Sequence, residues 1–419
     1  MVQNFSVGPS AFLPNLNEKI AEILNSQICE KSHRSPEFTK MSQKTVSNLR
    51  RFLKIPENYE IFYTASSTEA MQIAIQNGVE KKSAHFSCGA FGEKWAKMAQ
   101  NCGKEISHFA KNFGERHEIS EIEIPENCET IFLTVNETST GAAFSPNEIS
   151  EIRKKFPEKL FCLDATSAAG AVDFEIANLD AFLFSVQKCF GVPSGLGILI
   201  CSPRFFAKSE KINFKNHFHN LPMMAKKMRE KCQTCETPPV LQIATLGAAI
   251  EIIENQIGDL KKCAEKTRQK AEILWNFFEQ NSKFAPFVEN KKHRSQTVIV
   301  VRGDENEIEN AKKICAENEI NLAGGYGKTK KNAFRIANFL ASEKDDFEII
   351  FRLLQWNFIV ISRKIFTKKT SIKIAKSKVF WRIFKYAKML LCGKKIEVLK
   401  FFCYNWERIL RKIHKTKIF

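Results

Sequence analysis

Lys188 follows directly on the apolar run "AFLFSV" and precedes the turn-rich stretch "CFGVPSGLG". An amine at the end of a buried strand is partly desolvated, which lowers its pKa and makes it available as a nucleophile toward a carbonyl carbon. The same position also suits a structural lysine whose stem lies along apolar surface while its charge reaches water. Taken alone, the position leaves both interpretations open.

Two further features follow apolar runs of strand length. Asp164 comes after "LFCL", where a carboxylate is seldom buried without a partner. Ser67 and Thr68 begin an expected helix directly after a strand, where free backbone N–H groups and the helix dipole favour an anion such as phosphate. Each feature also has a structural interpretation: a hydrogen bond to the next turn for Asp164, and an ordinary helix cap for the helix start.

The surrounding pattern predicts that these side chains converge. Apolar runs of strand length alternate with segments of helical spacing, and the runs lie at residues 59–66, 129–137, 159–166, 180–188 and 195–203. Buried strands between amphipathic helices indicate a parallel sheet covered on both faces, and ligands of such sheets bind outside the carboxyl ends of the strands. A lysine, a carboxylate and an anion-binding helix start at one sheet edge are together what pyridoxal 5′-phosphate requires.

The pattern divides the 419 residues into four parts. We expect an N-terminal segment at residues 1–14 that packs near the site, and a large α/β domain at residues 15–245. Residues 246–356 mix shorter strands and helices, which predicts a smaller α+β domain. Residues 357–419 form a tail outside the predicted fold. The total length fits two domains with substantial cores.

Nearly all of the net charge of +18 belongs to the tail. Residues 357–419 hold 18 Lys and Arg against 2 Asp and Glu, which leaves 46 against 44 for residues 1–356. Because the tail interleaves basic residues with Phe, Trp and Tyr, it could bind nucleic acid or an anionic membrane surface. Read-through or a frameshift into A+T-rich sequence would give the same composition without any function.

The thirteen cysteines are an odd number in a chain that shows no signal peptide, which favours reduced thiols and a cytoplasmic location. No apolar run reaches the ~18 residues of a membrane-spanning helix. Cys232 and Cys235 in "CQTC" lack a second pair or a nearby His at zinc-site spacing, so we expect no metal site.

Nine short sequence motifs are spread over nearly the whole of residues 3–356. They are "FSVGPS", "SHRSPEF", "TASSTEAM", "GAFGEKW", "NETSTG", "LDATSAAGAVDF", "SVQKCFGVPSGLG", "QTCETPPVL" and "GGYGKTKKNAFRIANF". In this order they resemble the fold-type I, class V aminotransferases, and most closely the phosphoserine aminotransferase branch. The resemblance implies a pyridoxal 5′-phosphate cofactor and an α/β fold, with a mostly parallel seven-stranded sheet between helices and a smaller α+β C-terminal domain.

The resemblance also assigns roles around the cofactor ring. It implies that Lys188 bonds to the aldehyde and that Gln187 contacts the cofactor. Asp164 would pair with the ring nitrogen and keep it protonated. Phe91 in "GAFG" would stack on the ring, where the family commonly has tryptophan, and Thr138 would hydrogen-bond the 3′ oxygen.

The implied phosphate site is shared between two subunits. Ser67 and Thr68 would hold the cofactor phosphate, and Thr237 in "ETPP" would reach it from the neighbouring subunit of an obligate homodimer. The best-known branch has Asn before this threonine, whereas this chain has Glu236. Because an acid beside a phosphate is unfavourable, Glu236 is left out of the predicted site.

The implied substrate contacts are basic residues. His33 and Arg34 in "SHRS" would face the distal anion of the substrate, and Arg335 in "FRIAN" would grip its α-carboxylate. A planar guanidinium can meet a carboxylate with two hydrogen bonds. Where the best-known branch has a His-Arg pair, this chain reads "GKTKKN" and offers Lys328 and Lys330. These two lysines could equally belong to a solvated loop.

The resemblance implies transamination between L-glutamate and 3-phosphohydroxypyruvate, which gives O-phospho-L-serine and 2-oxoglutarate in serine biosynthesis. It also leaves a role in pyridoxine biosynthesis open. The altered "GKTKKN" loop keeps a second activity open, that of the alanine–glyoxylate or serine–pyruvate aminotransferases. A cysteine desulfurase is not expected, because no suitable cysteine lies between Cys315 and the tail.

Overall fold

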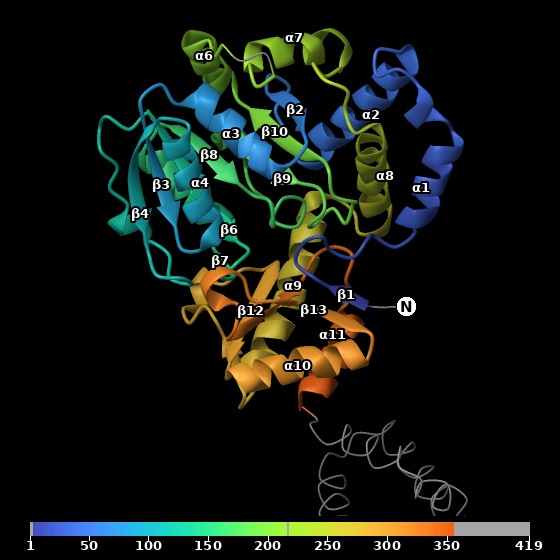
Figure 1. Cartoon of the computed structure of the whole chain (residues 1–419), viewed down its shortest axis with the longest axis vertical. Helices are drawn as coiled ribbons and strands as arrows, with labels where there is room; N and C mark the ends of the chain where they lie inside the picture. Colours follow the sequence, from blue (N-terminus) through green and yellow to red (C-terminus); the bar gives the residue numbers. More distant parts are fainter. Residues whose placement is uncertain (1–2, 216–217, 356–419) are drawn as a thin grey trace, which may run out of the picture. The chain divides into compact units, whose positions relative to one another are not determined.

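The computed structural model describes residues 3–215 and 218–355 (Figure 1). The tail predicted for residues 357–419 lies outside the described residues. The interpretations offered for it, nucleic-acid binding, membrane binding or an absence of function, therefore stay predictions.

The larger sheet has seven strands. Their spatial order is β2 (Glu60–Thr64), β10 (Gly197–Cys201), β9 (Ala181–Ser185), β8 (Leu160–Asp164), β5 (Thr130–Thr134), β3 (Lys82–Ser87) and β4 (Glu105–Ala110). Neighbours from β9 to β4 pair in parallel, whereas β10 is antiparallel to both β9 and β2. Residues 186–196 between β9 and β10 are too few for the helical crossover that a parallel pair requires. The predicted, mostly parallel seven-stranded sheet is confirmed.

Helices cover this sheet. Helices α3 (Ser67–Gly78) and α4 (Ala90–Asn101) pack on its strands and lie in front of it in Figure 1. Strands β5, β8, β9 and β10 are buried along their whole length, as expected where both faces of a sheet are covered. The other helices of this part are α1 (Leu16–Asn25), α2 (Pro36–Phe52), α5 (Pro146–Lys155), α6 (Pro203–Ile212), α7 (Leu221–Lys231) and α8 (Val240–Gln256).

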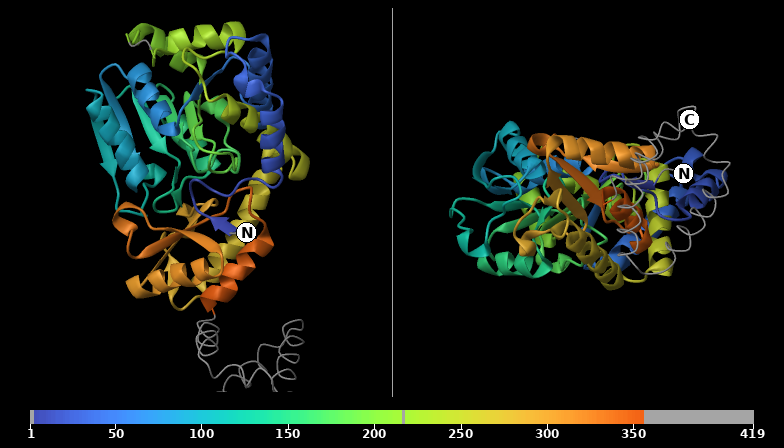
Figure 2. Two further views of the ribbon diagram at one scale, coloured as in Figure 1. Left: turned by 45° about the vertical axis from the view of Figure 1, so that its right-hand side comes forward. Right: turned by 90° about the horizontal axis from the view of Figure 1, so that it is seen from below.

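A second sheet carries five further strands. Its order is β1 (Gln3–Phe5), β13 (Ile320–Gly324), β14 (Ala333–Ala337), β12 (Val298–Gly303) and β11 (Phe284–Pro286), and its helices are α9 (Leu260–Glu279), α10 (Glu305–Glu317) and α11 (Lys344–Gln355). β1 pairs in parallel with β13, so the N-terminal strand belongs to this sheet, beside the orange strands in Figure 2. A short hairpin, β6 (Asn136–Glu137) with β7 (Ala142–Ala143), follows β5.

Neither a membrane span nor a metal cluster occurs in the part of the chain that the structure describes. None of its helices has both the length and the apolar character needed to cross a bilayer. No group of three or more His, Cys, Asp or Glu side chains there could hold a metal ion. Cys232 and Cys235 are both free thiols.

His85 on β3 makes the stability of this fold sensitive to acid. The ring is 1% exposed and stacks on Phe132 at 4.8 Å; its Nε2 contacts Ser83 Oγ at 3.0 Å, and its Nδ1 is buried without a partner. Burial, with a smaller effect of His108, lowers the pKa of His85 to about 3. The folded protein therefore holds this imidazole neutral across the pH range in which an unfolded chain protonates it.

We expect the free energy of unfolding to fall as the pH drops from about 6.5 toward 3, because only the unfolded state takes up this proton. At about 1.4 kcal/mol per pKa unit, His85 alone accounts for a loss of roughly 4–5 kcal/mol over that window. Urea unfolding of the wild type and His85→Gln at pH 7, 6, 5 and 4 measures the effect. Equal pH slopes for the two proteins would exclude His85 as the cause.

Candidate active site

Lys188 lies just beyond the carboxyl end of β9 and is 8% exposed. The Ser10 hydroxyl donates to the Lys188 carbonyl oxygen at 2.9 Å. A Cβ added to Gly8, whose φ is +149°, would lie 2.6 Å from Lys188 Nζ, so a larger residue at this position would displace the amine. Burial, followed by the positive charge of Arg335, lowers the pKa of Lys188 to about 8. Roughly a tenth of the amine is then neutral and nucleophilic at pH 7.

Asp164 ends β8, the strand beside β9, so it and Lys188 come from neighbouring strand ends. The side chain is 3% exposed, and burial raises its pKa to about 6. Its Oδ1 accepts hydrogen bonds from the backbone N–H of Thr166, at 2.9 Å, and from the Thr166 hydroxyl. No described residue donates to Oδ2. A buried carboxylate satisfied on one side only would gain from a cationic N–H donor, which a protonated pyridine ring supplies.

Helix α3 begins at Ser67, as the sequence predicts. Ser66 caps the helix, and the Ser67 backbone N–H donates to Ser185 Oγ at 2.7 Å. Lys94, from α4, donates to Thr68 Oγ1 at 2.8 Å. This cation lies at a helix start that already favours an anion. Lys94 was not predicted, because one lysine on an amphipathic helix carries no distinguishing signal.

Phe91 lies in the first turn of α4, and Lys188 Nζ is 6.0 Å from the centroid of its ring. Buried Glu137 holds this turn in place. Its Oε2 accepts from the backbone N–H groups of Phe91 and Gly92 at 3.1 and 3.0 Å, and its Oε1 accepts from the N–H and hydroxyl of Ser139. Burial raises the pKa of Glu137. Glu137 was not predicted, although an acid directly after a buried strand was a usable signal.

Strand β14 of the second sheet brings Arg335 to the same place. Its Nε donates to the Gly324 carbonyl oxygen at 2.8 Å, and its Nη1 donates to the Thr138 carbonyl oxygen at 3.2 Å. The Thr138 hydroxyl donates to Ser167 Oγ at 2.8 Å. Burial lowers the pKa of Arg335 to about 10, which still leaves the guanidinium charged near neutral pH. These contacts and charge interactions bring together Lys188, Asp164, Phe91, Thr138 and Arg335.

Arg34 lies elsewhere and is engaged within its own chain. Its guanidinium donates to the Gln233 side chain and to the carbonyl oxygens of residues 234 and 235, at 3.3, 2.6 and 3.2 Å. It thereby fastens the segment that leads to Thr237, which is exposed. No hydrogen bond or ion pair joins His33, Arg34 or Thr237 to Lys188 or Arg335 within the described chain. Their predicted contacts across a subunit interface stay predictions.

Glu236 and Lys328 are among the departures from the family pattern. Burial, followed by the charge of Glu69, raises the pKa of Glu236. Lys328 Nζ lies 3.6 Å from Glu93 Oε1 and 4.7 Å from the centroid of the Phe113 ring, with its side chain 73% exposed. In this chain Lys328 therefore faces α4 rather than Arg335.

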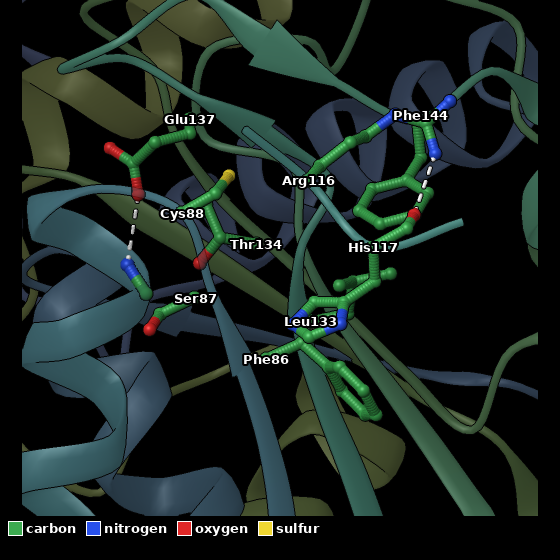
Figure 3. Close-up of a pocket in the computed structure, with 10 residues that line it drawn as sticks. Phe86, Ser87, Cys88, Arg116, His117, Leu133, Thr134, Glu137 and Phe144 are labelled. Carbon is green, nitrogen blue, oxygen red and sulfur yellow. Dashed lines mark hydrogen bonds between the residues drawn. The ribbon is translucent and has the colours of Figure 1, made fainter. Parts of the chain in front are cut away.

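A small cavity borders Glu137 (Figure 3). Cys88, Arg116 and Thr134 line it as well, and its volume of about 10 Å³ matches at most one water molecule. Arg116 Nε and Thr134 Oγ1 are buried there without partners. The cavity is too small for a cofactor or a substrate.

Sequence comparison identifies one family along most of the chain. The model of the family "Aminotransferase class-V" matches residues 2–334. A phosphoserine aminotransferase of Corynebacterium glutamicum is 31% identical over 354 residues, which cover 82% of this chain and 91% of that protein. A phosphoserine aminotransferase of Rhodococcus opacus is 27% identical over 361 residues, covering 84% and 94%.

Comparison with solved structures agrees with this result. A phosphoserine aminotransferase from Cytophaga hutchinsonii is 33% identical, with a TM-score of 0.81 over 85% of this chain and all of that chain. An alanine–glyoxylate aminotransferase from Nostoc has a TM-score of 0.73 over 84% of this chain and 94% of its own, but at 21% identity this similarity concerns the fold alone.

Proposed function

Since the chain belongs to the class V aminotransferase family, we propose that it transfers the amino group of L-glutamate to 3-phosphohydroxypyruvate, giving O-phospho-L-serine and 2-oxoglutarate. The observation that carries the proposal is the meeting of Lys188 and Asp164 from adjacent strand ends with Arg335 from the second sheet. The relatives that are 31% and 33% identical over most of this chain are both named phosphoserine aminotransferases.

Pyridoxal 5′-phosphate is the cofactor, and the residues present fit it. The Asp164 Oδ2 atom has no donor among the described residues, and the Gln187 Oε1 atom beside Lys188 is buried without one. When bound, pyridoxal phosphate supplies an electron sink that stabilises negative charge at the substrate Cα. The residues that would hold its aldehyde, ring, 3′ oxygen and phosphate are Lys188, Asp164, Gln187, Phe91, Thr138, Ser67 and Thr68, with Thr237 of a second copy.

Each residue of the cluster then has a distinct task. The neutral amine of Lys188 takes the proton from the substrate Cα as a general base and can return it as an acid. Asp164, ionised at neutral pH, holds a proton at the cofactor's ring nitrogen. Arg335 binds the α-carboxylate that glutamate and 3-phosphohydroxypyruvate share. The second anion of either substrate would meet His33, Arg34 or Lys328, which requires a homodimer if the first two act across the interface.

A panel of amino donors and acceptors tests the proposal on purified, cofactor-loaded protein. We expect glutamate with 3-phosphohydroxypyruvate to react at least about 100-fold faster, in kcat/KM, than alanine or serine with glyoxylate or pyruvate, since only the first pair offers a second anion to the cations expected around the distal end of the substrate. The orientation of Lys328 toward Glu93 keeps the alanine–glyoxylate or serine–pyruvate activity as the second candidate. Fast turnover of alanine or serine would favour that candidate.

A further inference from the structure

The turn between β13 and β14 presents one exposed aromatic ring, that of Tyr326. The Tyr326 backbone N–H donates to Thr329 Oγ1 at 3.0 Å, and the Thr329 hydroxyl donates back to the Tyr326 carbonyl oxygen at 3.0 Å. Thr329 is 2% exposed, and a Cβ on Gly325 would lie only 2.0 Å from the Thr329 carbonyl oxygen. The turn is therefore tightly built, whereas Tyr326 itself is 48% exposed.

The Tyr326 ring joins two groups of the site. It stacks on Phe91, with ring centroids 5.3 Å apart and planes 14° apart. The Arg335 Cζ atom lies 5.6 Å from the centroid of the same ring. Tyr326 thus links the ring expected to stack on the cofactor with the guanidinium expected to bind the substrate carboxylate. Tyr326 lies in the motif "GGYGKTKKNAFRIANF", but the sequence analysis gave it no role, because its contact with Phe91 joins segments that are distant in sequence.

Arg335 is consequently constrained on three sides. The Gly324 carbonyl oxygen accepts from its Nε, the Thr138 carbonyl oxygen accepts from Nη1, and the centroid of the Tyr326 ring lies 5.6 Å from Cζ. Among the described residues, none accepts a hydrogen bond from Nη2. The Nη1–Nη2 edge is therefore the one left for a carboxylate, which such an edge can bind through two parallel hydrogen bonds.

We propose that Tyr326 is a positioning residue for substrate binding, and that its ring fixes the Arg335 guanidinium so that the Nη1–Nη2 edge is preorganised for the α-carboxylate of the amino donor or keto acid. The inference rests on the proposed function for the role of Arg335. A guanidinium that is already held in place loses less conformational freedom when the carboxylate binds, so the ring contributes to affinity without touching the reacting atoms.

The test compares two ligands by calorimetry on the cofactor-loaded protein. Glutarate carries two carboxylates, whereas 4-aminobutyrate is glutamate without its α-carboxylate. Tyr326→Ala is expected to weaken glutarate binding about tenfold, within the range of a partly desolvated cation–π contact, and to leave 4-aminobutyrate binding unchanged. Tyr326→Phe, which keeps the ring, should restore glutarate binding, and Tyr326→Leu should not. Ile349→Ala, which truncates an exposed side chain on α11, serves as the control.

Steady-state kinetics supplies a second measurement. Tyr326→Ala should raise KM for glutamate about as much as it weakens glutarate binding, with kcat within twofold, because ground state and transition state lose the same contact. The proposal is overturned if Tyr326→Ala binds glutarate as tightly as the wild type, or if the substitution weakens the binding of glutarate and of 4-aminobutyrate equally. Either result would leave the proposed function intact. Absence of turnover with 3-phosphohydroxypyruvate, together with the expected binding pattern, would instead overturn the proposed function alone. If the wild-type protein fails to bind glutarate, the Nη1–Nη2 edge of Arg335 is not a carboxylate site and the proposal for Tyr326 is wrong.

Discussion

Replacing Lys188 with alanine is expected to lower the rate of transamination by a factor of about 10³ or more, which is the contribution of a positioned general acid–base group together with the loss of the nucleophilic amine. The visible absorbance of the cofactor bound to this lysine should disappear. Single-turnover kinetics with glutamate and an absorbance spectrum measure the two effects.

The control for this variant is Lys97→Ala, which removes an exposed lysine from α4. It should keep both the absorbance and the rate. An added small primary amine should restore part of the activity of Lys188→Ala, because the cavity left by the side chain can admit it. If Lys188→Ala retains the absorbance of the wild type, another residue holds the cofactor and the assignment of Lys188 is wrong.

The strand ends could be predicted from sequence because their signal is local. The apolar runs before Asp164 and Lys188 are buried strands, and consecutive parallel strands commonly lie side by side, so the two residues were expected at one edge. The helix start at Ser67 follows equally from its position directly after a strand. For these residues, the local sequence is enough to predict where the side chain lies.

The remaining contacts depend on pairings between distant segments, which a single sequence does not show. The stack of Phe91 on Tyr326 and the hydrogen bond from Arg335 to Thr138 each join the first sheet to the second. Likewise, the pairing of β1 with β13 could not be inferred, because a three-residue strand carries no periodic signal. The predicted roles of His33, Arg34 and Thr237 require a second subunit and stay predictions.

Asp164→Asn is expected to lower the activity of the enzyme but to raise the stability of the cofactor-free protein. The amide cannot hold a proton at the cofactor's ring nitrogen, so the electron sink weakens and kcat should fall by about 10²–10³, as when one preorganised electrostatic contact is removed from a site. Burial raises the pKa of Asp164 from 3.8 to about 6, so the folded protein is destabilised as the pH rises through that interval. At pH 7 this amounts to roughly 3 kcal/mol, which the neutral amide avoids.

Cofactor-free Asp164→Asn should therefore unfold at a higher temperature than the wild type at pH 7, and the difference should vanish near pH 4.

Asp180→Asn is the matched control, because Asp180 is equally buried but is paired with Arg153 at 3.1 Å and accepts hydrogen bonds from Ser202 and from the Phe161 N–H. Removing its charge should lower stability by about 3–5 kcal/mol. If Asp164→Asn raises the stability and Asp180→Asn lowers it, then the charge of Asp164 is retained for cofactor binding, although it destabilises the fold. A loss of stability in Asp164→Asn comparable to that of Asp180→Asn would mean that Asp164 is a structural carboxylate.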